Sequence, residues 1–162
     1  MTRRPQQLLA GMAVAALLAV AGALVTQHVL GMLPCAWCVL QRLIFVAVAM
    51  ASLLGLVVSR LLPGVLGTRL GAGLALVLAG LGMAAALWQH VVANASASCN
   101  MTLADRVMGA TGLDSRFPEV FAAYASCADA KADLFGLPYE FWSLALFALL
   151  ALAALRVLLR PR

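Results

Sequence analysis

Two of the four cysteines, Cys35 and Cys38, form a C-x-x-C motif. Two-residue spacing lets a disulfide open and close with little backbone movement, and it often lowers the pKa of one thiol. The pair therefore favours thiol–disulfide exchange. Pro34 disfavours helix in the residue before it, which predicts a helix that begins near Ala36. Cys38 would then lie in the first turn, where the helix dipole and free N–H groups stabilise a thiolate.

The other two cysteines, Cys99 and Cys127, stand far apart in the sequence. A disulfide between them would close a loop that tolerates distortion, which suits a bond that another protein's thiolate attacks. The alternative is two static disulfides with a structural role. A zinc site would need two close pairs, or histidines at ligand spacing, so no metal is expected.

Arg42 is the one charged residue well inside an apolar run, one helical turn after Cys38 and on the same face. A charge at that depth is costly unless it reaches the interface or a partner. Arg42 could snorkel to the headgroups, or it could hold the Cys38 thiolate or an oxygen of a bound quinone. His28 and His90 fall at similar depth, where each could donate to a quinone carbonyl, move a proton, or have no role.

The amino-acid composition indicates that transmembrane helices must position these cysteines, the arginine and the histidines. Of 162 residues, 65% are hydrophobic and 10% charged, which fits a chain whose main solvent is lipid. A span takes roughly 20 apolar residues, and four such runs cover about 8–29, 39–62, 70–92 and 141–159. The prediction is one all-α domain over 1–162, a bundle of four transmembrane helices. A cleaved signal peptide ending near Ala21 is the less favoured reading of the first run, because that run continues past it.

Charge placement predicts the topology. The net charge of +5 could suggest nucleic acid, but all six acids lie between Asp105 and Glu140. Seven of the eleven basic residues lie at span ends: Arg3, Arg4, Arg60, Arg69, Arg156, Arg160 and Arg162. This is the positive-inside pattern. It predicts cytoplasmic termini and outer loops at about 30–38 and 93–140, which are periplasmic if the host is a bacterium.

The long outer loop carries two helix patterns. Thr102 to Asp105 reads as a capping box, and Gly112 could end the helix that it starts. Apolar residues then follow helical spacing at Phe117, Val120, Phe121 and Tyr124. This predicts a short amphipathic helix on the membrane surface, or else a loop with some buried aromatic residues.

The chain resembles DsbB, the bacterial disulfide-bond formation protein family. The resemblance covers nearly the whole chain in order, and its motifs are Gln27-His28-Val29, Pro34-Cys35-Ala36-Trp37-Cys38, Arg42, Gln89-His90, Cys127-Ala128 and Leu134-Phe135-Gly136-Leu137. Gln41 departs from the family, which often has an acid before the arginine. Any proton-handling role of that position is therefore left open.

The resemblance implies a protein-thiol:quinone oxidoreductase of the inner membrane. Cys99 would form a mixed disulfide with a DsbA-like periplasmic thiol oxidase, and Cys127 would pass the electrons on by exchange with Cys35. Cys38 would be the thiolate that contacts a membrane quinone, either ubiquinone or menaquinone.

The resemblance also implies that Arg42 holds the quinone in place and that His90 is a weaker quinone contact. Lipid, quinone and the partner oxidase are the expected partners, with no nucleic acid. Two rival functions remain. One is an enzyme resembling vitamin K epoxide reductase, in which the C-x-x-C would be expected at the end of a late span. The other is a non-enzymatic membrane scaffold with structural disulfides.

Overall fold

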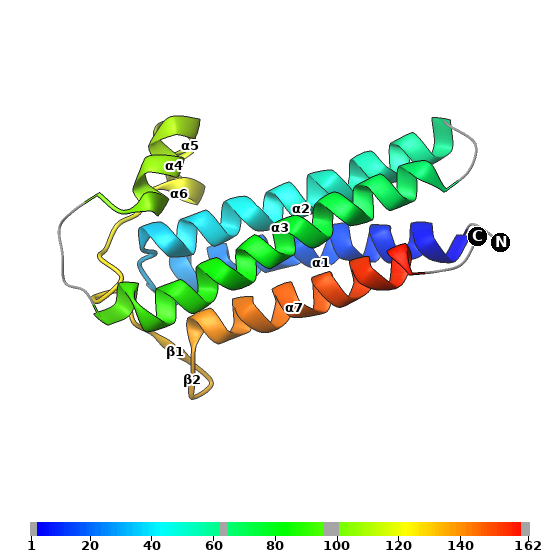
Figure 1. Cartoon of the computed structure of the whole chain (residues 1–162). Coiled ribbons are helices and arrows are strands. Elements are labelled where there is room, and N and C mark those ends of the chain that lie inside the picture. The colour runs from blue at the N-terminus through cyan, green and yellow to red at the C-terminus, as the bar shows by residue number, and fades with distance from the viewer. Residues whose placement is uncertain (1–2, 62–64, 96–100, 160–162) are drawn as a thin grey trace.

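The computed structural model describes residues 3–61, 65–95 and 101–159. Its main body is a bundle of four long helices, with a smaller helical segment at one end (Figure 1). The long helices are α1 (Arg3–His28), α2 (Ala36–Leu61), α3 (Leu66–Val91) and α7 (Tyr139–Leu158). Each is long and apolar enough to cross a membrane. The predicted all-α bundle of four spans is therefore confirmed.

The helix bounds differ from the apolar runs mainly where polar residues join a helix. α1 begins at Arg3 rather than near residue 8, and α3 begins at Leu66 rather than near residue 70. α2 begins at Ala36, as Pro34 predicts, rather than at residue 39. Hydropathy marks the part of a helix that lipid covers, whereas backbone hydrogen bonds continue beyond it.

Small residues and aromatic rings fill the bundle interior. A Cβ added to Gly71 of α3 would lie 2.6 Å from the Cα of Gly55 on α2, so both glycines are needed for this close approach. The rings of Phe45 and Phe147 stack with centroids 3.9 Å apart. Phe147 in turn lies against Gly82, where an added Cβ would be 2.4 Å from the ring. α2, α3 and α7 are thus packed together by matching small and large side chains.

The outer faces of the bundle are apolar. Large exposed side chains occur on every long helix, among them Leu18, Leu54, Val77 and Leu149. In water such a surface would aggregate, whereas in a bilayer it meets lipid tails. The chain is therefore a multi-pass membrane protein.

The segment between α3 and α7 contains a short 3-10 helix, η1 (Ala93–Ala95), then α4 (Leu103–Thr111), α5 (Leu113–Arg116) and α6 (Pro118–Phe121). The strands β1 (Asp133–Leu134) and β2 (Leu137–Pro138) pair antiparallel before α7. The predicted capping box is present, since Thr102 and Asp105 bond reciprocally. Gly112 ends α4 in the left-handed conformation, with φ of 63°, which a glycine adopts without strain.

The predicted amphipathic helix over 117–124 is only partly present. Helix covers Pro118–Phe121, and Ala122 is extended. The cause is a tertiary contact, because the backbone N–H of Tyr124 donates to the carbonyl of Pro34 at 2.9 Å. Phe121 is buried, whereas Phe117 and Tyr124 are about half exposed. The local pattern could not anticipate that the chain leaves the helix early to reach the loop between α1 and α2.

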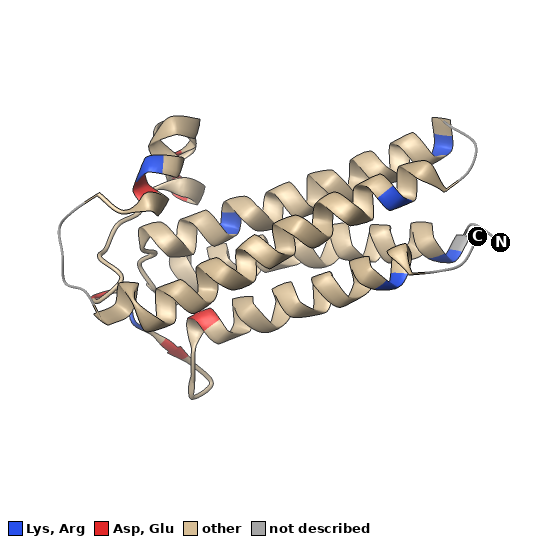
Figure 2. Cartoon of the chain, viewed as in Figure 1, with Lys and Arg blue, Asp and Glu red and all other residues tan. Residues whose placement is uncertain are grey.

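Acidic residues are confined to one end of the bundle, whereas basic residues occur at both ends (Figure 2). The described basic residues of the helix ends, Arg4, Arg60, Arg69 and Arg156, belong to the end of the bundle where α1 and α3 begin and α2 and α7 end. The acids lie at the opposite end with α4 to α6 and the strands. The helix ends predicted to share one side of the membrane therefore do lie together.

Candidate functional site

The C-x-x-C pair lies at the start of α2. The carbonyl of Cys35 accepts the first helical bond, from the Val39 N–H at 3.0 Å, so Cys35 caps the helix. Cys38 is in the first turn, as the sequence predicts, and its Sγ is 3.2 Å from the Cys35 Sγ. Cys35 is fully buried and Cys38 is half-buried. The two sulfurs are close enough to join as a disulfide with little movement.

Cys127 reaches the same site from the distant loop. It packs against the cluster that contains Cys35, and its side chain is close enough to affect the pKa of the Cys35 thiol. Hydrogen bonds with Cys127 and Cys38, together with burial, raise the pKa of Cys35 above its ordinary value. Three sulfurs therefore meet at the start of α2. Cys99, the fourth predicted site residue, lies outside the described residues.

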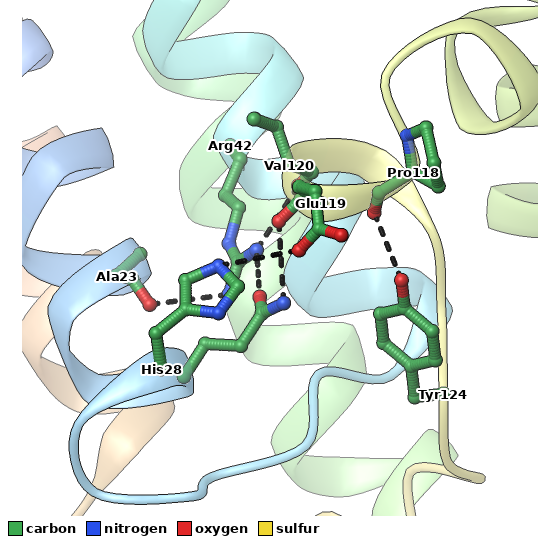
Figure 3. A network of polar contacts seen from close by, with 8 residues as sticks. Ala23, His28, Arg42, Pro118, Glu119, Val120 and Tyr124 are labelled. Carbon is green, nitrogen blue, oxygen red and sulfur yellow. Dashed lines mark hydrogen bonds and ion pairs between the residues drawn. The ribbon is translucent and has the colours of Figure 1, made fainter.

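Arg42 is buried, with 5% of its surface exposed, so it does not snorkel to the membrane surface. Its Nη1 donates to the Gln27 Oε1 at 2.6 Å and to the Val120 carbonyl at 3.0 Å, and its Nη2 donates to the Ala23 carbonyl at 3.3 Å. Figure 3 shows the guanidinium between α1 and α6, with Glu119 and His28 nearby. Arg42 thus joins three elements: α1, α2 and the loop.

Gln27 is a site residue that sequence reasoning did not single out, although it belongs to a motif of the resemblance. It accepts from Arg42, and its Nε2 donates to the Glu119 carbonyl at 3.2 Å. The only sequence sign was a polar side chain near the end of an apolar run. His28, its neighbour, is exposed and lies 3.9 Å from the Glu119 carboxylate.

A cavity of about 200 Å³ opens beside Cys38 and Arg42, between α1 and α7. Its other walls come from residues of all four long helices and the strand segment: Ala19, Gly22, Ala23, Thr26, Gln41, Phe45, Gln89, Leu134, Tyr139, Trp142, Ser143 and Leu146. The Trp142 ring N–H donates to the Leu134 carbonyl at 3.1 Å, which ties α7 to the first strand at this wall. The lining is mostly apolar with a few polar groups, as in sites for flat organic ligands.

One polar atom of this site has no partner within the described residues. The Arg42 Nε is buried and makes no hydrogen bond. An orphaned buried N–H costs free energy, and such groups often mark a site that a ligand completes. Arg42 also lines the cavity. The residues present therefore fit a ligand with an acceptor oxygen, such as a quinone carbonyl.

Two amides connect Cys38 to α3. Gln41 donates to the Gln89 Oε1 at 2.7 Å, and the Gln89 Nε2 lies 3.2 Å from the Cys38 Sγ. Gln89 was noticed in the sequence only as part of a motif with His90. A polar side chain in an otherwise apolar run is the sequence feature that could have indicated a functional role for Gln89.

His90 is not among the residues that line the cavity. Its Nδ1 lies 2.7 Å from the Glu140 Oε1, and Asn94 donates to the same oxygen at 2.9 Å. Glu140 is buried. The structure thus places His90 beside a carboxylate in the first turn of α7, and its role as a weaker quinone contact stays a prediction.

The fold and the site together define a class: a multi-pass membrane protein whose cysteine pair meets an apolar cavity beside a buried arginine. The family model for "Disulfide bond formation protein DsbB" matches residues 5–157. The chain belongs to the DsbB family, an oxidoreductase family, and this membership implies a role in disulfide bond formation.

Curated relatives agree with this over most of the chain. "Disulfide bond formation protein B" of Aromatoleum aromaticum is 32% identical over 139 residues, covering 84% of this chain and 81% of its own. The protein of the same name from Herminiimonas arsenicoxydans is 29% identical over 161 residues and covers 99% of both chains. "Disulfide bond formation protein B 2" of Pseudomonas aeruginosa is 33% identical over 149 residues, covering 88% and 85%.

Proposed function

We propose that this protein is a thiol:quinone oxidoreductase, which reoxidises a DsbA-like periplasmic thiol oxidase and passes the electrons to a membrane quinone. The observation that carries the proposal is the shared wall of Cys38 and Arg42, whose buried Nε has no partner within the described residues. A sulfur nucleophile and an unpaired donor beside one apolar cavity suit a ligand that accepts electrons and carries carbonyl oxygens.

The proposed order of exchange begins at the loop cysteines. The partner's thiolate attacks Cys99 of a Cys99–Cys127 disulfide, and the bond breaks so that Cys127 leaves as a thiolate. The partner's second thiolate attacks the partner–Cys99 mixed disulfide, so the partner leaves with its own disulfide and Cys99 becomes a thiolate. Cys127 attacks Cys35 of the Cys35–Cys38 disulfide, which frees Cys38 as a thiolate. Attack of Cys99 on Cys127 of the new Cys127–Cys35 bond restores the loop disulfide and releases Cys35, so that Cys35 and Cys38 hold the two electrons for the acceptor. The packing of Cys127 against the cluster that contains Cys35 supports the attack of Cys127 on Cys35, because attack requires the two sulfurs to meet.

A quinone bound in the cavity would supply a two-electron acceptor that also takes up two protons. This chain's own residues do the rest. Cys38 and Arg42 both line the cavity, where Arg42 offers a fixed positive charge to the acceptor. The apolar wall from α1 and α7 excludes water. His90 remains the weaker acceptor contact that the resemblance implies, with its Nδ1 2.7 Å from the Glu140 Oε1.

The direction of electron flow follows from redox potentials. DsbA-type oxidases have reduction potentials of about −120 mV, which makes them some of the most oxidising protein dithiols. Regenerating one therefore needs an acceptor that is stronger still, and exchange among protein dithiols cannot supply it indefinitely. A quinone dissolved in the bilayer can. We include both ubiquinone and menaquinone in the proposal.

The proposed orientation puts the basic end of the bundle in the cytoplasm and the cysteines on the periplasmic side of the bacterial inner membrane. It rests on the grouping of Arg4, Arg60, Arg69 and Arg156 at one end. In intact cells, a membrane-impermeant maleimide should label a cysteine placed at Phe135, and should fail to label one placed at Leu66 until the cells are opened. The reverse pattern would reject this orientation.

The direct test combines purified full-length protein in lipid nanodiscs, a reduced DsbA-like protein, and either ubiquinone or menaquinone. Quinone absorbance should fall catalytically while the partner gains an equal number of disulfides. Cys38→Ser should abolish the reaction. Ser52→Ala is the control and should not, because it is a buried change on the same helix whose hydroxyl donates to the Val48 carbonyl one turn earlier. If the redox state of the cysteines stays the same whether or not the partner and quinone are added, the protein is a structural scaffold instead.

A further inference from the structure

Two glutamine side chains lie buried between α2 and α3. Gln41 is 3% exposed and Gln89 is 4% exposed. Burying an amide in an apolar environment costs free energy unless its donors and acceptors are bonded, so the contacts of this pair matter. Gln41 Nε2 is 2.7 Å from Gln89 Oε1, and Gln89 Nε2 is 3.2 Å from the Cys38 Sγ.

These contacts have a definite direction. An amide nitrogen can only donate, so the donation from Gln41 occupies the Gln89 oxygen and turns the Gln89 nitrogen toward the sulfur. The sulfur must therefore act as the acceptor. A thiolate accepts a hydrogen bond more strongly than a thiol does. The arrangement suits a sulfur that carries negative charge.

We propose that Gln89 is a positioning residue that stabilises Cys38 as a thiolate, and that Gln41 fixes the orientation of the Gln89 amide. This explains why position 41 carries an amide. A carboxylate at Gln41 would place a negative charge near the thiolate, and it could not donate to Gln89 while ionised.

The proposal gives Gln89 a part in thiol exchange. When Cys127 attacks Cys35, a Cys127–Cys35 bond forms, the Cys35–Cys38 bond breaks, and the electron pair leaves on Cys38. A thiolate that is better stabilised leaves faster. The Gln89 N–H would stabilise this leaving group. Its value for turnover rests on the proposed function, whereas its effect on the thiolate does not.

Other groups also face Cys38 and must stay constant in a test. Cys35 lies before α2, Arg42 is on α2, Lys131 is in the loop, and Tyr139 and Glu140 are on α7; the last four share a cavity wall with Cys38. Within the described residues, the hydrogen-bond contacts to the sulfur itself come from Cys35 and Gln89. Changing Gln89 or Gln41 leaves all the ionisable neighbours in place.

The test measures alkylation of Cys38 against pH in the fully reduced, full-length protein, with each cysteine resolved by mass spectrometry. Gln89→Leu should move the midpoint of Cys38 alkylation upward by about one pH unit, which is a tenfold fall in the acid dissociation constant of the thiol. Gln89→Glu should move it further in the same direction. The matched control is Gln6→Leu, which removes a glutamine that bonds Ser59 between α1 and α2 at the far end of the bundle; its midpoint should stay unchanged.

A merely structural role for Gln89 would change how much Cys38 reacts at high pH but leave the midpoint in place, and that result would overturn the proposal. If Gln89→Leu fails to fold, Gln41→Leu carries the test, since it frees the Gln89 amide without touching the sulfur; an unchanged midpoint there overturns the proposal equally. The assay uses neither quinone nor partner. If the Cys38 midpoint shifts but the protein never reduces quinone, the proposed function is rejected and the role of Gln89 is retained.

Discussion

Arg42 Nη1 lies 2.6 Å from the Gln27 Oε1, so a neutral amide holds the buried guanidinium. Its other acceptors, from Ala23 and Val120, are backbone carbonyls, and no carboxylate pairs with it within the described residues. A buried cation bonded only to neutral groups keeps its positive charge uncompensated. That charge is available to an anion that forms beside it, which at this site is the Cys38 thiolate or an oxygen of the electron acceptor.

The first prediction concerns Arg42. Arg42→Ala should raise the Michaelis constant for quinone about tenfold or more, because a hydrogen bond from a charged group is worth roughly 1.5–3 kcal/mol and 1.4 kcal/mol is a factor of ten. Steady-state kinetics with varied quinone measures it. Arg60→Ala removes an exposed charge from the far end of the same helix and should leave the constant unchanged. If the Michaelis constant for quinone is unaltered in Arg42→Ala, Arg42 does not bind the quinone.

The second prediction follows from the meeting of Cys35 and Cys127. In Cys38→Ser, Cys35 has lost its disulfide partner, so its thiolate should attack Cys127 of the Cys99–Cys127 disulfide and release Cys99 as a thiolate. The Cys35–Cys127 disulfide formed in this way should accumulate, because no Cys38 sulfur is present to resolve it. Peptide mapping without reduction would detect it. In the unchanged protein, Cys35 should be found mainly with Cys38. Finding Cys35 free in the variant would contradict the proposed route.

The third prediction is a pH dependence. Since the pKa of Cys35 is raised by Cys127, by Cys38 and by burial, its thiol should stay protonated through neutral pH and become a thiolate only under alkaline conditions. In the fully reduced protein, Cys35 should therefore react with iodoacetamide more slowly than Cys127 at pH 7. Rates resolved by mass spectrometry give the comparison. Cys127→Ala should lower the pH at which Cys35 begins to react, because it removes the largest contribution.

The fourth prediction concerns bundle packing. Gly82→Ala would push a methyl group into the Phe147 ring, which is fully buried and stacked on Phe45. Overpacking of this kind costs about 1–3 kcal/mol, so the melting temperature in detergent should fall by several degrees. Gly80→Ala is the matched control, since a Cβ there meets nothing within 4 Å. Equal melting temperatures for the two variants would refute this packing.

The fifth prediction concerns the buried acid of α7. Glu140→Gln should destabilise the protein by about 1–3 kcal/mol, because its oxygen bonds both His90 and Asn94 with little solvent. Glu119→Gln changes an exposed carboxylate and should be close to neutral. Thermal unfolding of both variants measures the difference in stability between them. A loss of quinone reduction without loss of stability would instead point to a part for Glu140 in proton movement.

The sequence by itself determined the elements and the local chemistry. Long apolar runs must form helices in lipid, and basic residues mark the ends of those runs that lie together in the bundle. Pro34 fixes the start of α2, which puts Cys38 in its first turn. All of these depend on residues close together in the chain. The placing of Arg42 one turn beyond Cys38 follows from the same helical period.

The tertiary structure decided which distant residues share the site. It brought Cys127 to Cys35, lined the cavity with α1 and α7, joined Gln89 to Cys38, and turned His90 toward Glu140. It also cut the expected loop helix short at Phe121. Periodicity along one segment reports which face of a helix is apolar, but not which neighbour packs there. Contacts between segments depend on how whole helices pack, and that information is spread over the entire chain.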